Sequence, residues 1–429
     1  MFEQLLAKKA KIAVVGLGYV GLPIALEFAK YFSVIGFDVN EEKIQMMKRG
    51  IDPSEEMEEK MFKNKHIQFY SQPESLADAR FYIVAVPTPI DEYNQPDLRA
   101  LKSATRMVAK SLRPGDYVVF ESTVYPGCTE EVCVPILEQI SGLSFNEDFK
   151  VGYSPERINP GDKVNTIDKI VKIVSGSCPQ SLEMIAEVYG LIIRAGIHKA
   201  PTIKVAEAAK IVENTQRDIN IALMNELSMI FDKAGINTYD VLQAAGTKWN
   251  FLNFYPGLVG GHCIGVDPYY LIQRSIRLGH NPILISASRT VNDGMPVRIA
   301  SWIMEKLRDK GVKPREAKVL VQGVTFKENV SDVRNSKAAE LAKELMQYCE
   351  QVDVVDPQAD PREVRQEYNI NMKPSVGKSY DVVVVAVSHQ EYCQLDEDFY
   401  RSVCTDKGIL FDVKGIFRGR IHELQYLSL

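Results

Sequence analysis

The sequence is poor in the residues that build disulfide frameworks and metal sites. It has seven cysteines, an odd number, and six histidines in 429 residues, and no Cys-x-x-Cys pair. This pattern argues against a disulfide framework and against a zinc site. We therefore expect a reducing compartment, free thiols and no metal.

A basic excess and a membrane-length apolar run are also missing. Lys plus Arg total 51 against 56 for Asp plus Glu, a formal net charge of −5. This balance predicts no general surface for nucleic acid. No apolar stretch approaches the roughly 20 residues that span a bilayer. We expect a cytoplasmic protein that binds neither nucleic acid nor membrane.

The first third of the chain alternates short apolar runs with helical periodicity. Continuous apolar strands separated by helices predict a parallel sheet that is covered on both faces. The expected strands are 11–16, 33–38, 81–87, 117–123 and 149–156, with a helix over 20–31.

The middle of the chain predicts one long helix, and the last third returns to strands. Pro201 precedes and Gly235 follows an apolar stripe from Thr202 to Lys233, which would be about 48 Å long as a helix. Strand-like runs follow at 318–326, 352–357, 380–388 and 408–415, in an order that echoes the first third as a weak internal repeat.

The expected fold class is therefore α/β, with two Rossmann-like doubly wound domains joined by a helical central domain. The predicted divisions are 1–200, 201–314 and 315–429. Two lobes joined in this way favour a cleft between them.

The segment GLGYVG (16–21) fits G-x-G-x-x-G after a strand and before a helix. Gly16 permits the tight turn, Gly18 the approach of a pyrophosphate, and Gly21 close packing of helix on strand. Asp38 ends the second strand about 20 residues later, where it would accept from a ribose 2′-OH. Together they predict NAD rather than NADP; the alternative is a structural glycine turn with a surface aspartate.

Further polar residues follow other strands, at the edge where open α/β sheets bind ligands. VPTPI (86–90) and ESTVYPG (121–127) place Thr123 near cofactor or substrate, or make it a turn cap. In SPERINPG (154–161), Glu156 is a candidate general base. The alternative for Glu156 is a surface pair with Arg157.

On the long helix, Lys210 and Asn214 are four residues apart and share a face. They would donate to a developing alkoxide or oxyanion if that face is turned to the substrate. Glu207 and Glu213 lie nearby, so a solvated charged face remains the alternative.

GGHCIGVDPYYL (260–271) surrounds Cys263 with glycines, and Asp267 follows. Glycine-rich backbone lets a substrate come close, and a thiolate presented there can act as a nucleophile. A buried inert cysteine is the alternative. His262 is adjacent to Cys263, so its side chain need not point the same way.

GVTFKENVSDVRNS (323–336) follows a strand of the last third. Lys327 and Arg334 are candidates to bind the phosphates of substrate or cofactor. The alternative is a surface turn of mixed charge.

Taken together, these motifs resemble the nucleotide-sugar 6-dehydrogenase family, the UDP-glucose and UDP-N-acetylhexosamine dehydrogenases. The resemblance runs over nearly the whole chain, from GLGYVGLP to DVKG. GGHCIGVDPYYL, SPERINPG, AAKIVENTQRD and TFKENVSDVRNS look like the N-acetylhexosamine branch. The segment 246–251 lacks an arginine that some UDP-glucose enzymes present near this point.

The resemblance implies oxidation of a sugar C6 alcohol to a carboxylate with two NAD⁺, for surface or capsular polysaccharide synthesis. UDP-N-acetylglucosamine or its galacto epimer is the favoured substrate. Cys263 would form a thiohemiacetal and then a thioester. Lys210 and Asn214 would hold the C6 oxygen, Asp267 and Thr123 would orient water or assist proton removal, and Glu156 would be the base for hydrolysis.

The same resemblance assigns ligands and an assembly. The N-terminal lobe would bind NAD, the C-terminal lobe UDP, and the central helix would form a homodimer. NAD would be held by Gly16, Gly18, Tyr19, Val20, Gly21, Asp38, Pro87, Thr88, Thr123 and Arg334. The substrate would be held by Glu156, Arg157, Lys210, Asn214, Phe251, Tyr255, Gly260 and Lys327.

Three rival functions remain at this point. One is a UDP-glucose 6-dehydrogenase, and another is a two-electron dehydrogenase of the hydroxyacid type, which needs neither the glycine-flanked cysteine nor a second α/β lobe. The third is a catalytically silent NAD-sensing protein, against which the candidate reactive residues argue.

Overall fold

The computed structural model describes residues 1–53, 57–63, 66–158, 166–261 and 263–429. The chain forms two compact units, which are described separately. Unit 1 comprises Met1–Glu213 and Tyr269–His280, and unit 2 comprises Asn214–Pro268 and Asn281–Leu429.

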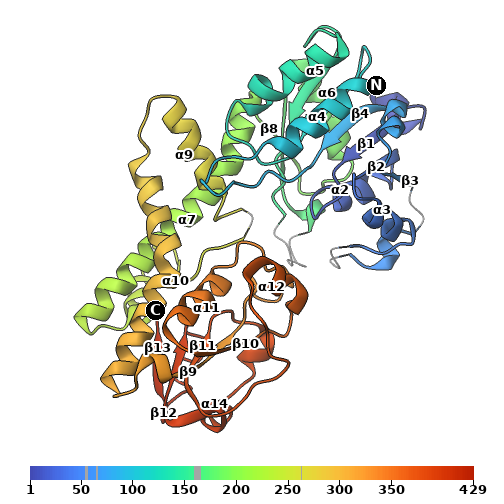
Figure 1. Cartoon of the computed structure of the whole chain (residues 1–429). Helices are drawn as coiled ribbons and strands as arrows, with labels where there is room; N and C mark the ends of the chain where they lie inside the picture. The colour runs from blue at the N-terminus through green and yellow to red at the C-terminus, as the bar shows by residue number, and fades with distance from the viewer. Residues whose placement is uncertain (54–56, 64–65, 159–165, 262) are drawn as a thin grey trace. The chain divides into compact units, whose positions relative to one another are not determined.

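Unit 1 is built on a sheet with strand order β3-β2-β1-β4-β5-β6-β7-β8. Figure 1 labels β1, β2, β3, β4 and β8 of this sheet. The first six strands are parallel, β7 runs antiparallel to β6, and β8 is parallel to β7. The order reverses between β1 and β4, the switch point at which doubly wound sheets bind ligands. The bounds are β1 (Lys11–Val15), β2 (Ser33–Phe37), β3 (Ile67–Tyr70), β4 (Ala79–Val84), β5 (Tyr117–Phe120), β6 (Lys150–Tyr153), β7 (Lys172–Gly176) and β8 (Ile197–Lys199).

Helices cover this sheet because its strands are apolar on both faces. Ile12 and Val14 of β1 point to one face, where they share a buried cluster with Phe28 of α2 and Val188 of α6. The helices of unit 1 before the long helix are α1 (Phe2–Leu6), α2 (Gly21–Phe28), α3 (Glu41–Lys48), α4 (Arg99–Ser111), α5 (Val134–Ser141) and α6 (Pro179–Gly190).

The long helix α7 spans Ile203–Ala234, within one residue of the predicted bounds at each end. Gly235 follows it with φ +68°, the left-handed conformation that commonly ends helices. The next helices are α8 (Thr238–Ala245), α9 (Asp267–Arg277) and α10 (Ile283–Asp309). Within the described ranges, no helix is both long and apolar enough to cross a membrane.

Unit 2 is built on a parallel sheet with strand order β10-β9-β11-β12-β13. Val319 and Val321 of β9 pack in one core with α10 and α11, and Leu320 packs in a second core with Tyr400 of α14. The strands are β9 (Lys318–Gln322), β10 (Gln351–Val355), β11 (Tyr380–Val385), β12 (Cys404–Asp412) and β13 (Gln425–Ser428); the helices are α11 (Lys337–Tyr348), α12 (Pro361–Tyr368), α13 (Gln390–Cys393) and α14 (Glu397–Val403).

The two sheets share a four-strand core, which gives the predicted repeat a structural form. The order β2-β1-β4-β5 in unit 1 corresponds to β10-β9-β11-β12 in unit 2. After the first strand of each core, Gly16 N donates to Phe37 O and Gly323 N donates to Val355 O. These glycines have φ of +93° and +90°. The predicted α/β class with two Rossmann-like sheets is confirmed.

The strand predictions differ from the structure in two ways. Predicted strands such as 81–87 and 117–123 ran past the true ends of β4 and β5, because their last residues form the loops at the sheet edge. The short strands β3, β7, β8 and β13 were not predicted.

Candidate active site

The glycine loop after β1 has two glycines that the fold needs and one that it does not. A Cβ on Gly16 would lie 2.7 Å from Ala85 O, and one on Gly21 would lie 1.8 Å from Gly16 O. A Cβ on Gly18 would have no neighbour within 4 Å. Gly18 therefore borders open space at the switch point of the sheet, where a pyrophosphate would approach.

Asp38 is fixed beside this loop. Its Oδ2 accepts from Leu17 N and its Oδ1 from Asn40 N, both at 2.9 Å. The side chain is half-buried directly after β2, and the turn before α2 carries the half-buried Tyr19 and Val20. The arrangement suits a dinucleotide, with the ribose facing the carboxylate and the phosphates facing Gly18.

The loops after β4 and β5 are joined at the same edge of the sheet. Thr88 Oγ1 donates to Thr123 O at 2.7 Å, and Ser122 Oγ donates to Val86 O at 2.7 Å. Tyr270 of α9 donates to Thr88 O at 2.8 Å. The predicted cofactor residues Thr88 and Thr123 are thus brought together. Pro87, which precedes Thr88 in the loop after β4, is exposed.

Glu156 lies directly beyond β6, but its partner is not the one considered from sequence. It is 7% exposed, and its Oε2 lies 2.6 Å from Lys172 Nζ. Arg157 instead pairs with Glu213 of α7 at 2.7 Å. The alternative of a Glu156–Arg157 surface pair is wrong, because adjacent loop residues direct their side chains to different neighbours.

Sequence reasoning missed the group that surrounds Glu156. Lys172 at the start of β7 also lies 3.0 Å from Glu121 Oε2, and Tyr189 of α6 donates to Glu121 Oε1. Burial raises the pKa of Glu121 to about 7. Burial also opposes the charge of Glu156, but Lys172 and two backbone N–H groups hold the pKa of Glu156 below its ordinary value.

The face of α7 that carries the predicted residues is buried. Lys210 and Asn214 are each 8% exposed and Glu207 is fully buried. Glu207 accepts from Gly127 N at 2.5 Å and Thr129 N at 2.9 Å, and burial raises its pKa to about 7. The alternative of a solvated charged face is wrong for these three residues.

Asn214 and Asp267, predicted separately, meet within unit 2. Asn214 Nδ2 donates to Asp267 Oδ2 at 2.5 Å, although the residues are 53 positions apart. Asp267 is the first residue of α9 and is 1% exposed. The pair is therefore a desolvated amide–carboxylate contact.

Cys263 lies one helical turn before Asp267. Its carbonyl accepts from Val266 N at 3.0 Å and from Asp267 N at 2.8 Å, so α9 is preceded by a turn that begins at Cys263. The N-terminal end of a helix favours negative charge, such as that of a thiolate. Cys263 is partly exposed rather than buried.

The cysteine loop packs on segment 323–336 of the same unit. Gly261 N donates to Asn335 O at 3.1 Å, and a Cβ on Gly260 would lie 2.3 Å from that oxygen. Gly261 has φ +82°, and a Cβ there would lie 2.6 Å from the ring of Phe326. Both glycines are therefore required by close packing. His262, like residues 159–161 of SPERINPG, lies outside the described residues.

The two predicted phosphate ligands of this segment have different surroundings. Lys327 is half-buried, and its carbonyl accepts from Thr325 Oγ1 at 2.9 Å. The Arg334 guanidinium pairs with Asp332 at 2.7 Å and its side chain is 57% exposed. Arg334 therefore has the surroundings expected for the alternative, a surface turn of mixed charge.

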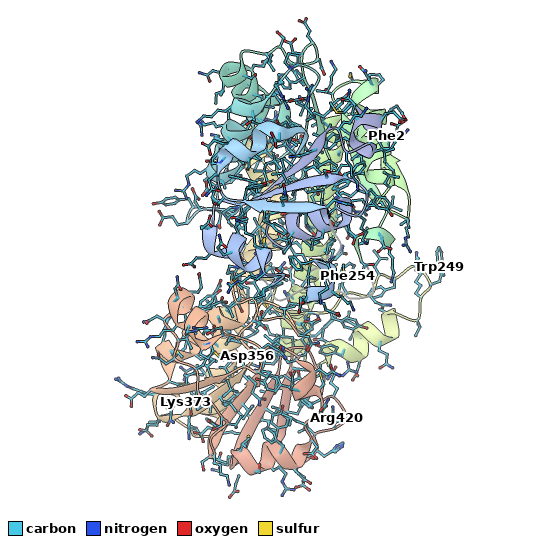
Figure 2. All side chains as sticks on the ribbon, turned by 90° about the vertical axis from the view of Figure 1, so that its right-hand side faces the viewer. Phe2, Trp249, Phe254, Asp356, Lys373 and Arg420 are labelled. Atoms are coloured by element: carbon cyan, nitrogen blue, oxygen red, sulfur yellow. The ribbon has the colours of Figure 1, made fainter. Side chains whose placement is uncertain are left out.

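A hollow of about 370 Å³ in unit 2 places the predicted substrate residue Tyr255 beside residues that sequence reasoning missed. The rings of Tyr239 and Tyr255 stack with centroids 6.0 Å apart, and the Arg418 guanidinium lies 4.5 Å from the centre of the Tyr239 ring. Phe251 is half-buried nearby in the chain, whereas Trp249 projects outward (Figure 2). The full lining is Tyr239, Leu242, Gln243, Gly246, Asn253, Tyr255 and Arg418.

In the part of the chain that the structure describes, no group of three His, Cys, Asp or Glu side chains could hold a metal ion. All seven cysteines are free thiols.

Known proteins match this chain over almost its whole length. Residues 10–193 match the NAD binding domain of the UDP-glucose/GDP-mannose dehydrogenase family, residues 204–294 its central domain, and residues 320–419 its UDP binding domain. Protein CapL of Staphylococcus aureus is 52% identical over 406 residues, which cover 94% of this chain and 96% of that protein.

A second relative and a solved structure agree with that match. The UDP-N-acetyl-D-glucosamine 6-dehydrogenase of Salmonella typhi is 52% identical over 408 residues, which cover 95% of this chain and 96% of that protein. The structure of a UDP-D-ManNAc dehydrogenase from Pyrococcus horikoshii has a TM-score of 0.90 at 29% identity and covers 97% of this chain and 98% of that one.

Proposed function

The chain belongs to the UDP-glucose/GDP-mannose dehydrogenase family, and we propose that it oxidises the C6 alcohol of a UDP-N-acetylhexosamine to the uronic acid. It is an NAD-dependent nucleotide-sugar dehydrogenase. UDP-N-acetylglucosamine is the favoured substrate because relatives at 52% identity include a UDP-N-acetyl-D-glucosamine 6-dehydrogenase.

One observation carries the chemistry of this proposal. Cys263 is partly exposed one helical turn before Asp267, and Asp267 binds the amide of Asn214. A two-electron alcohol dehydrogenase has no use for a thiol held in this way. A four-electron oxidation needs one, because an aldehyde becomes a hydride donor again after a thiol adds to it.

NAD fits the glycine loop of unit 1. Gly16 and Gly21 shape the loop, Gly18 leaves space for the pyrophosphate, and Asp38 receives the ribose. NAD⁺ held there would supply the hydride acceptor for both oxidation steps. A carboxylate at position 38 repels a 2′-phosphate, which favours NAD over NADP.

In the proposed sequence, Lys210 and Asn214 hold the C6 oxygen while the alcohol loses a hydride and a proton. Lys210 is 8% exposed and lies one helical turn before Asn214, so both side chains can donate to the same oxygen. The Cys263 sulfur then bonds to C6 of the aldehyde as the C6 oxygen takes up the thiol proton, and the thiohemiacetal loses a second hydride together with that proton to give a thioester.

Hydrolysis completes the reaction. Water adds to the thioester carbon as Glu156 takes one of its protons, and the S–C6 bond breaks to leave the Cys263 thiolate and a carboxylic acid. The acid releases the second proton to solvent and becomes the carboxylate product. Thr123 and Asp267 are proposed to orient the water or assist proton removal.

For the UDP part of the substrate we propose unit 2. The family's UDP binding domain matches residues 320–419, which include Lys327 and Arg418. Stacked tyrosines and a guanidinium suit a base and its phosphates. Arg418→Gln should raise KM for the UDP-sugar about tenfold, the loss of roughly 1.4 kcal/mol, with kcat little changed. An unchanged KM would move the nucleotide elsewhere.

A homodimer through α7 is part of the proposal. Val205, Val212, Leu223 and Ile230 are 45–55% exposed and lie on one stripe of the helix, because their spacings of 7 and 11 residues are close to whole turns. Light scattering should find a dimer, and Leu223→Glu with Ile230→Glu should give monomers. The control Arg217→Glu, at an exposed position roughly 120° around the helix from the stripe, should leave the dimer intact.

The cellular setting follows from the same premises. Free thiols and an NAD-dependent reaction suit the cytoplasm, and the similarity to CapL favours a role in capsule or other surface polysaccharide synthesis.

A panel of UDP-sugars tests the substrate assignment. UDP-N-acetylglucosamine or UDP-N-acetylgalactosamine should give a kcat/KM at least about 100-fold above that of UDP-glucose, because a site that bonds the acetamido group leaves polar groups unpaired around a hydroxyl. A preference for UDP-glucose would overturn the N-acetylhexosamine assignment, and the absence of NADH formation with every sugar would overturn the activity itself.

A further inference from the structure

Three charged side chains are buried together at the carboxyl edge of the unit 1 sheet. Lys172 Nζ lies 2.6 Å from Glu156 Oε2 and 3.0 Å from Glu121 Oε2. Their side chains are 3%, 8% and 0% exposed, respectively. Buried ion pairs contribute little net stability because desolvation offsets their attraction. The cluster therefore calls for a reason other than stability.

The sheet topology brings these residues together. β5 and β6 are parallel, so Glu121 and Glu156 follow them at the same edge. β7 runs antiparallel to β6, with Tyr153 opposite Ser175. Continuing that register for three residues sets Glu156 opposite Lys172. The reversal of chain direction at β7 thus places a lysine at the edge where ligands bind.

Both oxygens of Glu156 are held by donors. Oε1 accepts from Arg157 N and Ile158 N, each at 2.7 Å, and Oε2 accepts from Lys172. These contacts fix the orientation of the carboxylate. They also favour the ionised form of Glu156, whereas burial alone would favour the neutral acid.

Glu121 occupies the other side of the lysine. Its Oε2 faces Lys172, and its Oε1 accepts from the Tyr189 hydroxyl. Burial raises the pKa of Glu121 to about 7. Near neutral pH, Lys172 is therefore shared between two carboxylates or committed to Glu156 alone.

We propose that Lys172 is a positioning residue that orients Glu156 and keeps it ionised for thioester hydrolysis, and that Glu121 holds Lys172 in place. The inference rests on the proposed role of Glu156 as the base that takes a proton from water. Without Lys172, burial would favour the neutral acid, which cannot accept that proton.

The charged and titratable groups facing Glu156 come from four neighbouring elements. They are Lys172 of β7, Glu121 after β5, Tyr189 of α6, and Arg157 with its partner Glu213 of α7. Of these, Lys172 alone is a cation in direct contact with the carboxylate among the described residues. Removing Lys172 should therefore raise the pKa of Glu156 and favour its protonated form.

The perturbation is Lys172→Met, with Lys172→Arg as the variant that keeps the charge. Arg80→Met is the matched control, because Arg80 pairs with the buried Asp116 at the opposite, amino edge of the same sheet. Glu156→Gln is the reference for a lost base. If Lys172→Met does not fold, Lys172→Met with Glu121→Gln replaces it, since this double variant keeps the cluster's formal charge.

The measurement is a single turnover with UDP-N-acetylglucosamine and NAD⁺, followed by NADH absorbance and intact-protein mass. Lys172→Met should form NADH within about threefold of the unmodified rate but accumulate the Cys263 adduct. Its hydrolysis should slow at least about tenfold at pH 7 and recover by pH 9, because loss of the lysine raises the pKa of the buried Glu156 and a higher pH restores its carboxylate. Lys172→Arg should largely restore hydrolysis, and Arg80→Met should not slow it.

The outcomes separate the inference from the function on which it rests. If Glu156→Gln does not accumulate the adduct, Glu156 is not the base and the proposed hydrolysis step fails. If Glu156→Gln accumulates it but Lys172→Met hydrolyses normally at pH 7, the positioning role fails alone. A slowing in Lys172→Met that is equal at pH 7 and pH 9 would also overturn it, because a structural defect has no reason to recover with pH.

Discussion

The glycine loop offers a paired substitution that separates folding from cofactor binding. In Gly21→Ala the new Cβ would lie 1.8 Å from Gly16 O, far below the separation that carbon and oxygen tolerate, and the neighbour is backbone that cannot rotate away. Overpacking of this kind costs about 1–3 kcal/mol or more. In Gly18→Ala the new methyl has no neighbour within 4 Å, so the free energy of unfolding should change by less than about 0.5 kcal/mol.

Thermal unfolding and NAD⁺ titration read out the two effects. For a unit of this size each kcal/mol shifts Tm by about 2–4 °C. Gly21→Ala should therefore lower Tm by about 2–12 °C, and Gly18→Ala should leave it within about 2 °C. NAD⁺ binding should weaken at least about tenfold in Gly18→Ala, because its methyl occupies the approach of the pyrophosphate. Unchanged NAD⁺ affinity in Gly18→Ala would refute the assignment of this loop.

Three further predictions concern single side chains. Asp38→Ala should lower kcat/KM for NAD⁺ about tenfold and narrow the gap to NADP⁺, and equal use of both cofactors by the unmodified protein would contradict the role of Asp38. Cys263→Ala should lower kcat for complete oxidation roughly a thousandfold, or about 4 kcal/mol in activation free energy, while near-normal turnover would remove the nucleophile. Burial raises the pKa of Glu207 to about 7, so the native state binds a proton that the unfolded chain releases near pH 4.5, and stability is lost as pH rises to about 7. Measured by denaturant unfolding, the free energy of unfolding of Glu207→Gln should therefore exceed that of the unmodified protein by up to roughly 3 kcal/mol at pH 8 and should equal it at pH 4. A difference that does not change with pH would exclude ionisation of Glu207 as the cause.

The features that sequence predicted best depend on local spacing. GLGYVG and Asp38 could be interpreted together because the strand, turn, helix and strand that join them place Asp38 beside the glycine loop. The bounds of α7 could be predicted because Pro201 and Gly235 stop a helix whatever its surroundings. In each case the deciding interaction lies within a few residues or one supersecondary unit.

The partners of the candidate site residues depend on register and could not be predicted in this way. Glu156 was compared with its sequence neighbour Arg157, whereas its cation is Lys172 on β7, a strand that was not predicted. The contact between Asn214 and Asp267 joins α7 to α9 across 53 residues. The local signal that could have indicated the cluster around Glu156 was a lysine, Lys172, at the start of the apolar strand β7.

The central claim is a four-electron oxidation of a UDP-N-acetylhexosamine. Its most direct test is to count NADH formed per UDP-N-acetylglucosamine consumed and to identify the product by mass spectrometry. The account predicts two NADH for each sugar and a C6 carboxylate with no free aldehyde. One NADH for each sugar with an aldehyde or ketone product would contradict it.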